Sequence, residues 1–415
     1  MADVTITVMP RKLALLVFLI SLPLAAAPRR RAVSHPSLPA VNRASVAAVA
    51  LKIIDRVQIP AHEPRLHWEN APYLDGTLLV AEQLQRDDLK ERVAAVLLGS
   101  SDDIESIYWG DGTAFAQAAL DLYRMTPAND PRREALRALL GGPISFAEHA
   151  IRATPSSAPP RNPWWVEGGY GVRYWQDDLY MVVPWLAMYG SSKEGLPANA
   201  RARELAYEWI ESYVYDHRPQ LKERAGFLLW DPEHALFHHA PENIGTDEFW
   251  GRGNGWALLA LARAANYLDA PYSGTQYSTA ITANEIRALL VRAAEAIVQK
   301  RTPGGGWPSS LSKPLDCPMV ETSATGLITA FLARGVNEGW LDRETYVPVI
   351  LRAFALLMDR VDSGGYVSAI QPPGTGIAFC SAPMLSTNQT AINVNYGAGA
   401  VLLAAAEVLK LREMQ

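Results

Sequence analysis

The amino-acid sequence predicts an all-α fold built from stacked helical hairpins. Apolar residues recur three and four positions apart in about eleven segments, a spacing that places one face of an α-helix in a core. Convincing strands are missing, and only short stretches such as GFLLW and GYVSAI could pair. Loops rich in Gly, Pro and Trp separate the helices. Eleven or twelve such helices are expected to close into an α/α toroid, because an open superhelix would need a sequence repeat that the chain lacks.

The helical segments follow one another along most of the chain. Those with the clearest periodicity are Arg43–Val57, Thr113–Met125, Ala200–Tyr215, Asn254–Leu268, Asn284–Lys300, Ser323–Gly339, Arg343–Val361 and Tyr396–Leu411. Another apolar run follows Asp177, and Pro184 within it is expected to kink that helix. No shift in composition marks a second domain, so residues 41–415 are expected to form one domain.

The amino terminus has the anatomy of an export signal. Arg11 and Lys12 precede an apolar stretch, Leu13–Ala27, that ends in small residues. This stretch is too short for a comfortable membrane span. Residues 1–27 are therefore expected to be a signal peptide or an anchor and residues 28–40 a linker. We expect a secreted or periplasmic protein, in which Cys317 and Cys380 either pair or stay free.

Composition and charge exclude several classes of partner. The chain of 415 residues has a formal net charge of −5 and a pI of about 6.0. Nucleic acid is not expected as a partner, because phosphate binding needs a concentrated basic face. His234 and His238 are four residues apart, but nothing nearby completes a zinc site. No metal and no cofactor is expected, and the oligomeric state stays open between monomer and homodimer.

Tryptophan is concentrated beside Gly-rich turns and helix starts rather than inside the apolar runs. The residues concerned are Trp109, Trp164, Trp165, Trp175, Trp250, Trp256 and Trp307. An indole can stack on the apolar face of a sugar while its N–H donates a hydrogen bond. The alternative is that these rings close the ends of the helical barrel. As a set, they favour a carbohydrate-binding cleft.

Five motifs occur in a fixed order: YWQDDLYMVVPWLA, FWGRGNGWALLAL, ETSATGLITAFLARGVNEGWLD, GYVSAIQPPG and NYGAGAVLLAAAEVL. Together they resemble the unsaturated glycuronyl hydrolases of glycoside hydrolase families 88 and 105, from about Trp68 to the C-terminus. The resemblance implies an (α/α)6 barrel. It also implies removal of a 4,5-unsaturated uronic acid from the non-reducing end of oligosaccharides left by polysaccharide lyases, with pectin or rhamnogalacturonan fragments favoured.

The chemistry implied by the resemblance is hydration of a vinyl ether. A carboxylic acid protonates C4, water adds to C5, and the resulting hemiketal opens. One Asp can donate the proton and later accept one from water, so neither a metal nor a covalent intermediate is required. Ordinary glycosidases differ, because they use two carboxylates that flank the scissile bond.

Asp177 and Asp178 are adjacent carboxylates at the start of an apolar helix, directly after Trp175 and Gln176. Neighbours on a helix point about 100° apart, so both cannot face one cleft. The family pattern W-x-D-x-L-(Tyr/Phe)-M assigns the proton donor to Asp177. Asp178 is then explained as a helix cap or as a partner of the helix dipole, and is kept as a substrate-binding candidate.

Asp111 is the second catalytic candidate. In the resembled family, an Asp about a dozen residues before LDLY assists the acid. The residues around Asp111 depart from the usual Asp-Asp-x-x-x-Gly-Arg pattern, and Asp111-Gly112-Thr113 is explained equally well as a turn that leads into a helix.

The remaining candidates are expected to bind substrate. Arg252 could hold a uronate carboxylate in bidentate fashion. The other candidates are indoles, the Asn254 amide (alternatively a helix cap), either of two histidines, and Thr322 (alternatively part of a capped helix start). In full, the set comprises Trp109, Trp175, Asp178, His238, His239, Trp250, Arg252, Asn254, Trp256 and Thr322.

Three alternative functions remain open. Another (α/α)6 glycosidase, such as an endo-mannanase using an Asp pair, would act on saturated polymer. A non-catalytic carbohydrate-binding toroid would keep the aromatic residues but lose the acid, whereas WQDDLYM is intact. A sugar epimerase would need paired histidine bases on separate loops, whereas His234, His238 and His239 share one loop.

Overall fold

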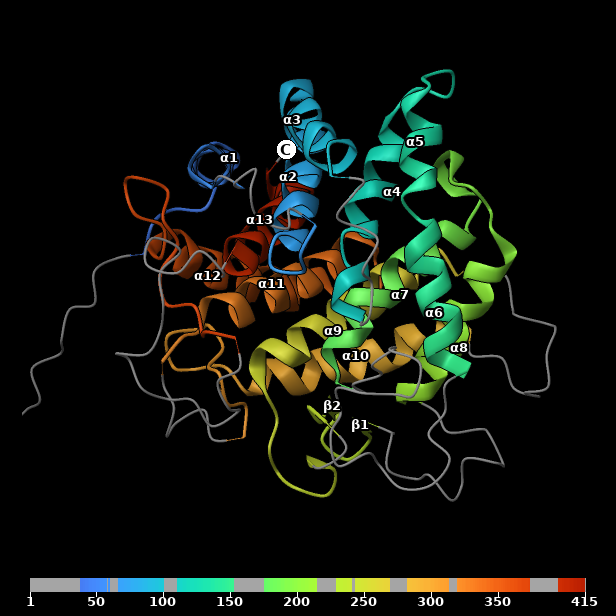
Figure 1. The fold of residues 1–415 in the computed structure, drawn as a ribbon. Coiled ribbons are helices and arrows are strands. Elements are labelled where there is room, and N and C mark those ends of the chain that lie inside the picture. Colours follow the sequence, from blue (N-terminus) through green and yellow to red (C-terminus); the bar gives the residue numbers. More distant parts are fainter. Residues whose placement is uncertain are drawn as a thin grey trace, which may run out of the picture. The chain divides into compact units, whose positions relative to one another are not determined.

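The computed structural model describes residues 38–57, 59, 66–100, 110–152, 175–214, 229–240, 243–268, 282–312, 319–373 and 395–414. Within these ranges the regular structure is helical apart from one short hairpin, β1 (Trp230–Asp231) paired antiparallel with β2 (Leu236–Phe237). This hairpin lies below α9 and α10 in Figure 1. The prediction of an all-α fold is confirmed. Leu13–Ala27, Cys317 and Cys380 lie outside the described residues.

Six helices form a closed inner ring. They are α2 (Ala71–Leu84), α4 (Ala116–Met125), α7 (Asp177–Gly190), α9 (Gly251–Ala264), α11 (Thr322–Asn337) and α13 (Asn395–Leu409). Each contacts the next in this order, and α13 contacts α2 again. Every residue of α9 and α13 is buried, as expected for helices covered on all sides. The toroid predicted from the sequence is therefore confirmed.

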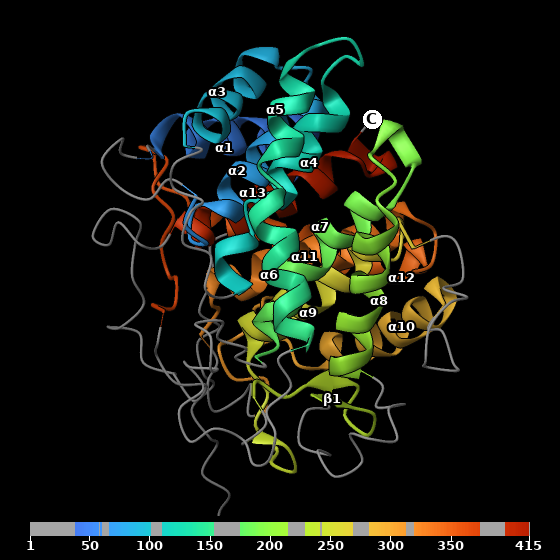
Figure 2. The same cartoon turned by 45° about the vertical axis from the view of Figure 1, so that its right-hand side comes forward.

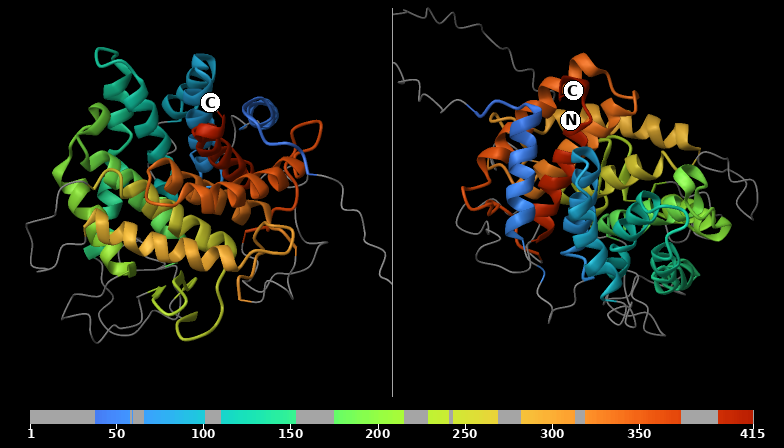
Figure 3. Two further views of the ribbon diagram at one scale, coloured as in Figure 1. Left: turned by 180° about the vertical axis from the view of Figure 1, so that it is seen from behind. Right: turned by 90° about the horizontal axis from the view of Figure 1, so that it is seen from above.

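The other long helices cover this ring from outside. They are α1 (Arg43–Arg56), α3 (Asp87–Leu98), α5 (Arg132–Ala138), α6 (Gly141–Arg152), α8 (Ala200–Val214), α10 (Ala283–Gln299) and α12 (Arg343–Asp359). Figure 2 shows α8 and α10 outside α7 and α9, and Figure 3 shows α10 and α12 from behind. Only one face of α10 is buried, through residues such as Ile286, Leu290 and Ile297. An amphipathic outer helix thus accounts for the spacing seen in Asn284–Lys300.

Between successive inner helices the chain returns through one outer helix, or through two, α5 and α6, between α4 and α7, so the inner helices all run the same way. Their N-terminal ends meet at one end of the ring and their C-terminal ends at the other. Helix starts are set locally: Thr282 and Glu285 form a capping box on α10, and the Asp342 carboxylate accepts from Thr345 N at the start of α12. None of the helices in the described ranges is long and apolar enough to cross a bilayer.

Pro184 lies inside α7 without ending it. Because proline has no N–H, the carbonyl of Tyr180 loses its helical donor. The side chain of Gln117 on α4 supplies a substitute, with Nε2 donating to Tyr180 O at 2.7 Å. Thr113 Oγ1 likewise donates to Met181 O at 2.9 Å. The proline therefore helps to attach α4 to the N-terminal half of α7, and the Thr113 contact adds to this attachment without depending on the proline.

Glycines let α2, α13 and α11 approach one another closely. A Cβ added at Gly76 would lie 2.7 Å from Leu402 Cβ, and one at Gly326 would lie 2.7 Å from the backbone of Ala400. Both distances are shorter than carbon atoms tolerate. A residue with a side chain at either position would push two inner helices apart.

Candidate active site

A row of rings crosses the N-terminal end of the inner helices. The ring of Trp175 lies 5.3 Å from that of His239, and His239 meets Trp250 edge-on at 4.9 Å. At the other side of this end, Trp68 stacks on Tyr396 at 5.1 Å. These five residues, called the aromatic row below, come from segments that precede or begin α2, α7, α9 and α13 and from the segment after β2.

Asp177 and His239 face each other beside this row. Oδ2 of Asp177 lies 3.4 Å from Nδ1 of His239, and their side chains are 14% and 20% exposed. Neither of these two atoms has a hydrogen-bond partner among the described residues. Gln176 N donates to the carbonyl of His239 at 3.0 Å, so the backbone holds the two side chains together. A partly exposed carboxylate with an imidazole beside it can take part in proton transfer.

Asp178 points away from this pair into the protein. Its Oδ2 accepts from Tyr213 Oη at 3.0 Å and from Trp175 N at 3.2 Å. The two carboxylates thus have different surroundings, as their helical offset predicts. A Cβ added at Gly110 would lie 2.9 Å from Oδ1 of Asp178. Asp178 therefore packs against η2, the short 3-10 helix Gly110–Thr113.

Asp111 lies within η2 and is buried. Ala114 N donates to the Asp111 carbonyl. The one O–H of Thr113 lies within reach of two carbonyls, 2.8 Å from Gly110 O and 2.9 Å from Met181 O, and is shared between them. The turn that leads into α4 is therefore present. A catalytic role for Asp111 stays a prediction.

Arg252 is buried at the start of α9, between two rings of the aromatic row. Its guanidinium carbon lies 4.5 Å from the centre of the Trp250 ring and 4.9 Å from that of Tyr396. Its Nη1 donates to the carbonyl of Gln371 and to Tyr396 Oη. These acceptors are neutral, and no carboxylate of the described residues forms an ion pair with Arg252.

Four sequence candidates make internal contacts instead. The Asn254 amide bonds both N (2.8 Å) and O (3.0 Å) of Phe237, which holds β2 against α9. Trp256 is fully buried, with its ring 4.4 Å from that of Tyr180. Thr322 Oγ1 donates to Ser368 O, and His238 is buried beside Asp231. Substrate contact by these residues stays a prediction, and Trp109 lies outside the described residues.

Sequence reasoning missed several residues at this end of the ring. Tyr396 and Gln371 contact Arg252 although they lie 144 and 119 positions away in the chain. Trp250 Nε1 also donates to Gln371 Oε1 at 2.8 Å. Both residues lie within quoted motifs, NYGAGA and GYVSAIQPPG, but no local pattern gives their partners. Among the described residues, no group of histidine, cysteine and carboxylate side chains could hold a metal ion.

These features place the protein in the class of (α/α)6 barrels with ionisable and aromatic side chains gathered at one end. The sequence model of Glycosyl Hydrolase Family 88 matches residues 46–412, so the chain belongs to this family.

Curated relatives share part of their length with this chain. A protein of Formosa agariphila named unsaturated 3S-rhamnoglycuronyl hydrolase is 30% identical over 244 residues, or 58% of each chain. One of the same name from an Alteromonas species is 26% identical over 317 residues, which are 74% of this chain and 68% of that protein. A solved family 88 glycosyl hydrolase from Bacteroides vulgatus superposes with a TM-score of 0.62 at 22% identity, covering 89% of this chain and 99% of that one. That likeness supports the shared fold.

Proposed function

We propose that the protein is a glycosidase that removes a 4,5-unsaturated uronic acid from the non-reducing end of an oligosaccharide. The observation that carries this proposal is the surroundings of Arg252. A buried guanidinium among rings and neutral acceptors favours a ligand that brings its own carboxylate. A uronic acid supplies that carboxylate and a pyranose face for the indoles.

Asp177 is proposed as the proton donor. Its carboxyl O–H passes a proton to C4 of the double bond, which leaves positive charge shared between C5 and the ring oxygen. Water then forms a bond to C5 and returns a proton to Asp177. The hemiketal opens by cleavage of the bond between C5 and the ring oxygen, which leaves a ketone at C5 and a hemiacetal at C1. Cleavage of the C1–O bond of this hemiacetal then releases the neighbouring sugar as an alcohol, so atoms and charge balance without another reactant. His239 and Asp111 are proposed to assist this acid.

The sugar after the uronic acid is proposed to be rhamnose. The curated relatives carry names that join rhamnose with a uronic acid. This agrees with the rhamnogalacturonan-type fragments favoured from the sequence motifs.

Export to the periplasm or the medium, through residues 1–27, is part of the same proposal. It predicts that the protein isolated from the producing cell begins after this segment, which N-terminal sequencing measures.

The deciding experiment uses disaccharides made by polysaccharide lyases. The double bond conjugated with the carboxylate absorbs ultraviolet light, and hydration removes that absorbance. We expect absorbance to fall fastest with a rhamnose-linked disaccharide and to stay constant without protein. Constant absorbance with every disaccharide would contradict the proposal. Cleavage of saturated mannan would then favour the endo-acting alternative, and binding without turnover the non-catalytic one.

The role of Arg252 is tested by R252M, which keeps the volume of the side chain but removes its charge. Loss of one partner of a desolvated charge pair costs about 2 kcal/mol or more, so KM should rise on the order of thirtyfold. Initial rates over a range of substrate concentrations measure this change. An unchanged KM would remove Arg252 from the binding site.

A further inference from the structure

Three histidines, His234, His238 and His239, lie in the β1–β2 hairpin or directly after it, and the proposed function uses only His239. The other two converge on one carboxylate. Oδ2 of Asp231 lies 3.0 Å from Nδ1 of His234 and 3.3 Å from Nε2 of His238. Both imidazoles also pack against Phe249, each with ring centres 4.9 Å apart. This cluster of Asp231, His234, His238 and Phe249 is called the hairpin cluster below.

The hairpin cluster stabilises the turn between β1 and β2, which contains an unfavourable backbone conformation. Oδ1 of Asp231 accepts from Glu233 N at 2.8 Å and from His234 N at 3.0 Å. Ala235, which follows, has a φ of 51°, a left-handed conformation that residues other than glycine adopt at a cost. The carboxylate therefore offsets the strain of the turn through one oxygen and joins the two imidazoles through the other.

His238 joins the hairpin cluster to the active-site residue that follows it in the chain. Burial lowers the pKa of the His238 imidazole, although Asp231 opposes the change. The neutral ring can then donate from Nε2 to the carboxylate. His238 N donates to Leu229 O at 2.8 Å. The next residue is His239, whose carbonyl accepts from Gln176 N and whose ring faces Asp177. Only one peptide bond separates the hairpin cluster from the side chain proposed to assist the acid.

We propose that Asp231 is a positioning residue, which holds the imidazole of His239 beside Asp177 through His238 and the hairpin turn. Asp231 contacts neither Asp177 nor the rings of the aromatic row in the described residues, so it acts only through the residues it orders. The inference rests on the proposed function. A misplacement of about 1 Å at a catalytic side chain is enough to lower turnover by up to about a hundredfold.

The variants test the Asp231 oxygen that faces the histidines separately from the oxygen that accepts hydrogen bonds from the turn. D231N keeps an acceptor for the two backbone amides but replaces the oxygen that faces the histidines with an NH2 group. H238L removes the ring nitrogen, whereas H238Q keeps a donor near the position of Nε2. We expect kcat to fall on the order of tenfold in D231N and H238L, with KM within about twofold of the wild type. H238Q should keep most of the wild-type kcat. E233Q, exposed in the same turn, is the matched control and should not change either constant.

A second measurement needs no turnover. Histidine labelled with 13C gives separate imidazole signals, and those of His239 can be identified as the signals lost in H239N. We expect the His239 signal to shift in D231N and H238L but not in H238Q or E233Q. If the wild type hydrates none of the disaccharides, the proposed function fails, while these signals still decide whether Asp231 orders His239. Unshifted signals in both variants, a wild-type kcat in either, or an H238Q variant as slow as H238L would overturn the inference.

Discussion

Helix α9 carries one arginine near each end of the ring, and the two have opposite surroundings. Arg252, at the N-terminal end, contacts rings and neutral acceptors. Arg263, three turns later, is buried between Asp75 on α2 and Asp121 on α4, with 2.8 Å from Nη2 to Asp121. Burial of a charge is costly unless a partner compensates for it. The partner of Arg263 is part of the fold, and that of Arg252 is expected to be the ligand.

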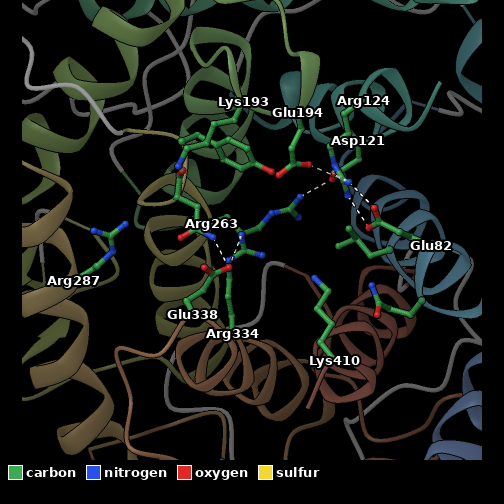
Figure 4. A pocket seen from close by; sticks show the side chains of 14 residues that line it. Glu82, Asp121, Arg124, Lys193, Glu194, Arg263, Arg287, Arg334, Glu338 and Lys410 are labelled. Carbon is green, nitrogen blue, oxygen red and sulfur yellow. Dashed lines mark hydrogen bonds and ion pairs between the residues drawn. The ribbon is translucent and has the colours of Figure 1, made fainter. Parts of the chain in front are cut away.

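The same contrast extends over both ends of the ring. At the C-terminal end, a pocket of about 480 Å³ is lined mostly by charged side chains, labelled in Figure 4. Arg124 bonds Glu82 at 2.6 Å and Arg334 bonds Glu407 at 3.0 Å. Arg287 donates to the carbonyl of Ala265 just beyond α9. Cations are favourable where helices end, because unpaired carbonyls concentrate negative charge there. The charged groups at this end have partners within the fold, whereas Asp177, His239 and Arg252 at the other end are proposed to bind and react with the substrate.

The largest expected effect is at the N-terminal end. D177N removes the proton donor while keeping the shape of the side chain, so kcat should fall by about a thousandfold. The melting temperature should stay within a few degrees, because Oδ2 of Asp177 makes no hydrogen bond in the described residues. Turnover and thermal unfolding of the same preparation measure both. Nearly normal turnover in D177N would reject this end as the catalytic one.

The reverse result is expected at the C-terminal end. R263M leaves Asp75 and Asp121 buried without their shared cation, which should lower the free energy of unfolding by about 3 to 5 kcal/mol. Its kcat, corrected for the folded fraction, should stay near the wild type. R252M on the same helix is the matched variant, and should lose affinity with a smaller loss of stability. Urea unfolding of both variants makes the comparison. Equal destabilisation would show that the two arginines do not differ as proposed.

A smaller effect is expected on the pH dependence of the free energy of unfolding, through Glu407 at the C-terminal end of the ring. Burial would raise the pKa of Glu407, but Lys410 and Arg334 outweigh it and lower that pKa to about 2. This value lies below the ordinary value for glutamate. The stabilisation is therefore complete above about pH 4.5 and is lost as pH falls toward 2, amounting to about 3 kcal/mol. In E407Q, the free energy of unfolding should fall less steeply between about pH 5.5 and 3.5. Identical slopes for E407Q and wild type would contradict this assignment.

The sequence predicts both the bounds and the buried face of an outer helix where that helix buries a single face. The expected Asn284–Lys300 and Arg343–Val361 correspond to α10 and α12, Ala283–Gln299 and Arg343–Asp359, and each of these helices buries one face. The inner helices give less information. Since all of α9 is buried, the spacing of its apolar residues does not show which face points to the ring axis and which packs on a neighbouring helix. Periodicity therefore could not tell that Trp256 contacts Tyr180.

The candidate site was predictable where one short motif carries its residues. Trp175 and Asp177 are two positions apart, and Trp250 and Arg252 likewise. His239 could not be separated from His238 by sequence, because adjacent histidines differ only in the direction that the hairpin gives each ring. Tyr396 and Gln371 join the site through closure of the ring. Such long-range pairing leaves no trace in local spacing.

The Arg263 bridge also governs how a sugar chain can travel. In the inner ring α9 stands opposite α2, so the bridge from Arg263 to Asp75 runs across the diameter, with Asp121 beside it and all three side chains buried. These three buried side chains thus close the axis of the ring between its two ends. A polysaccharide chain therefore cannot pass through the ring from one end to the other. A ligand that enters at the N-terminal end must leave at the same end. A site that is closed at one end suits removal of the terminal residue of a chain, one residue in each binding event, rather than processive movement along a polymer.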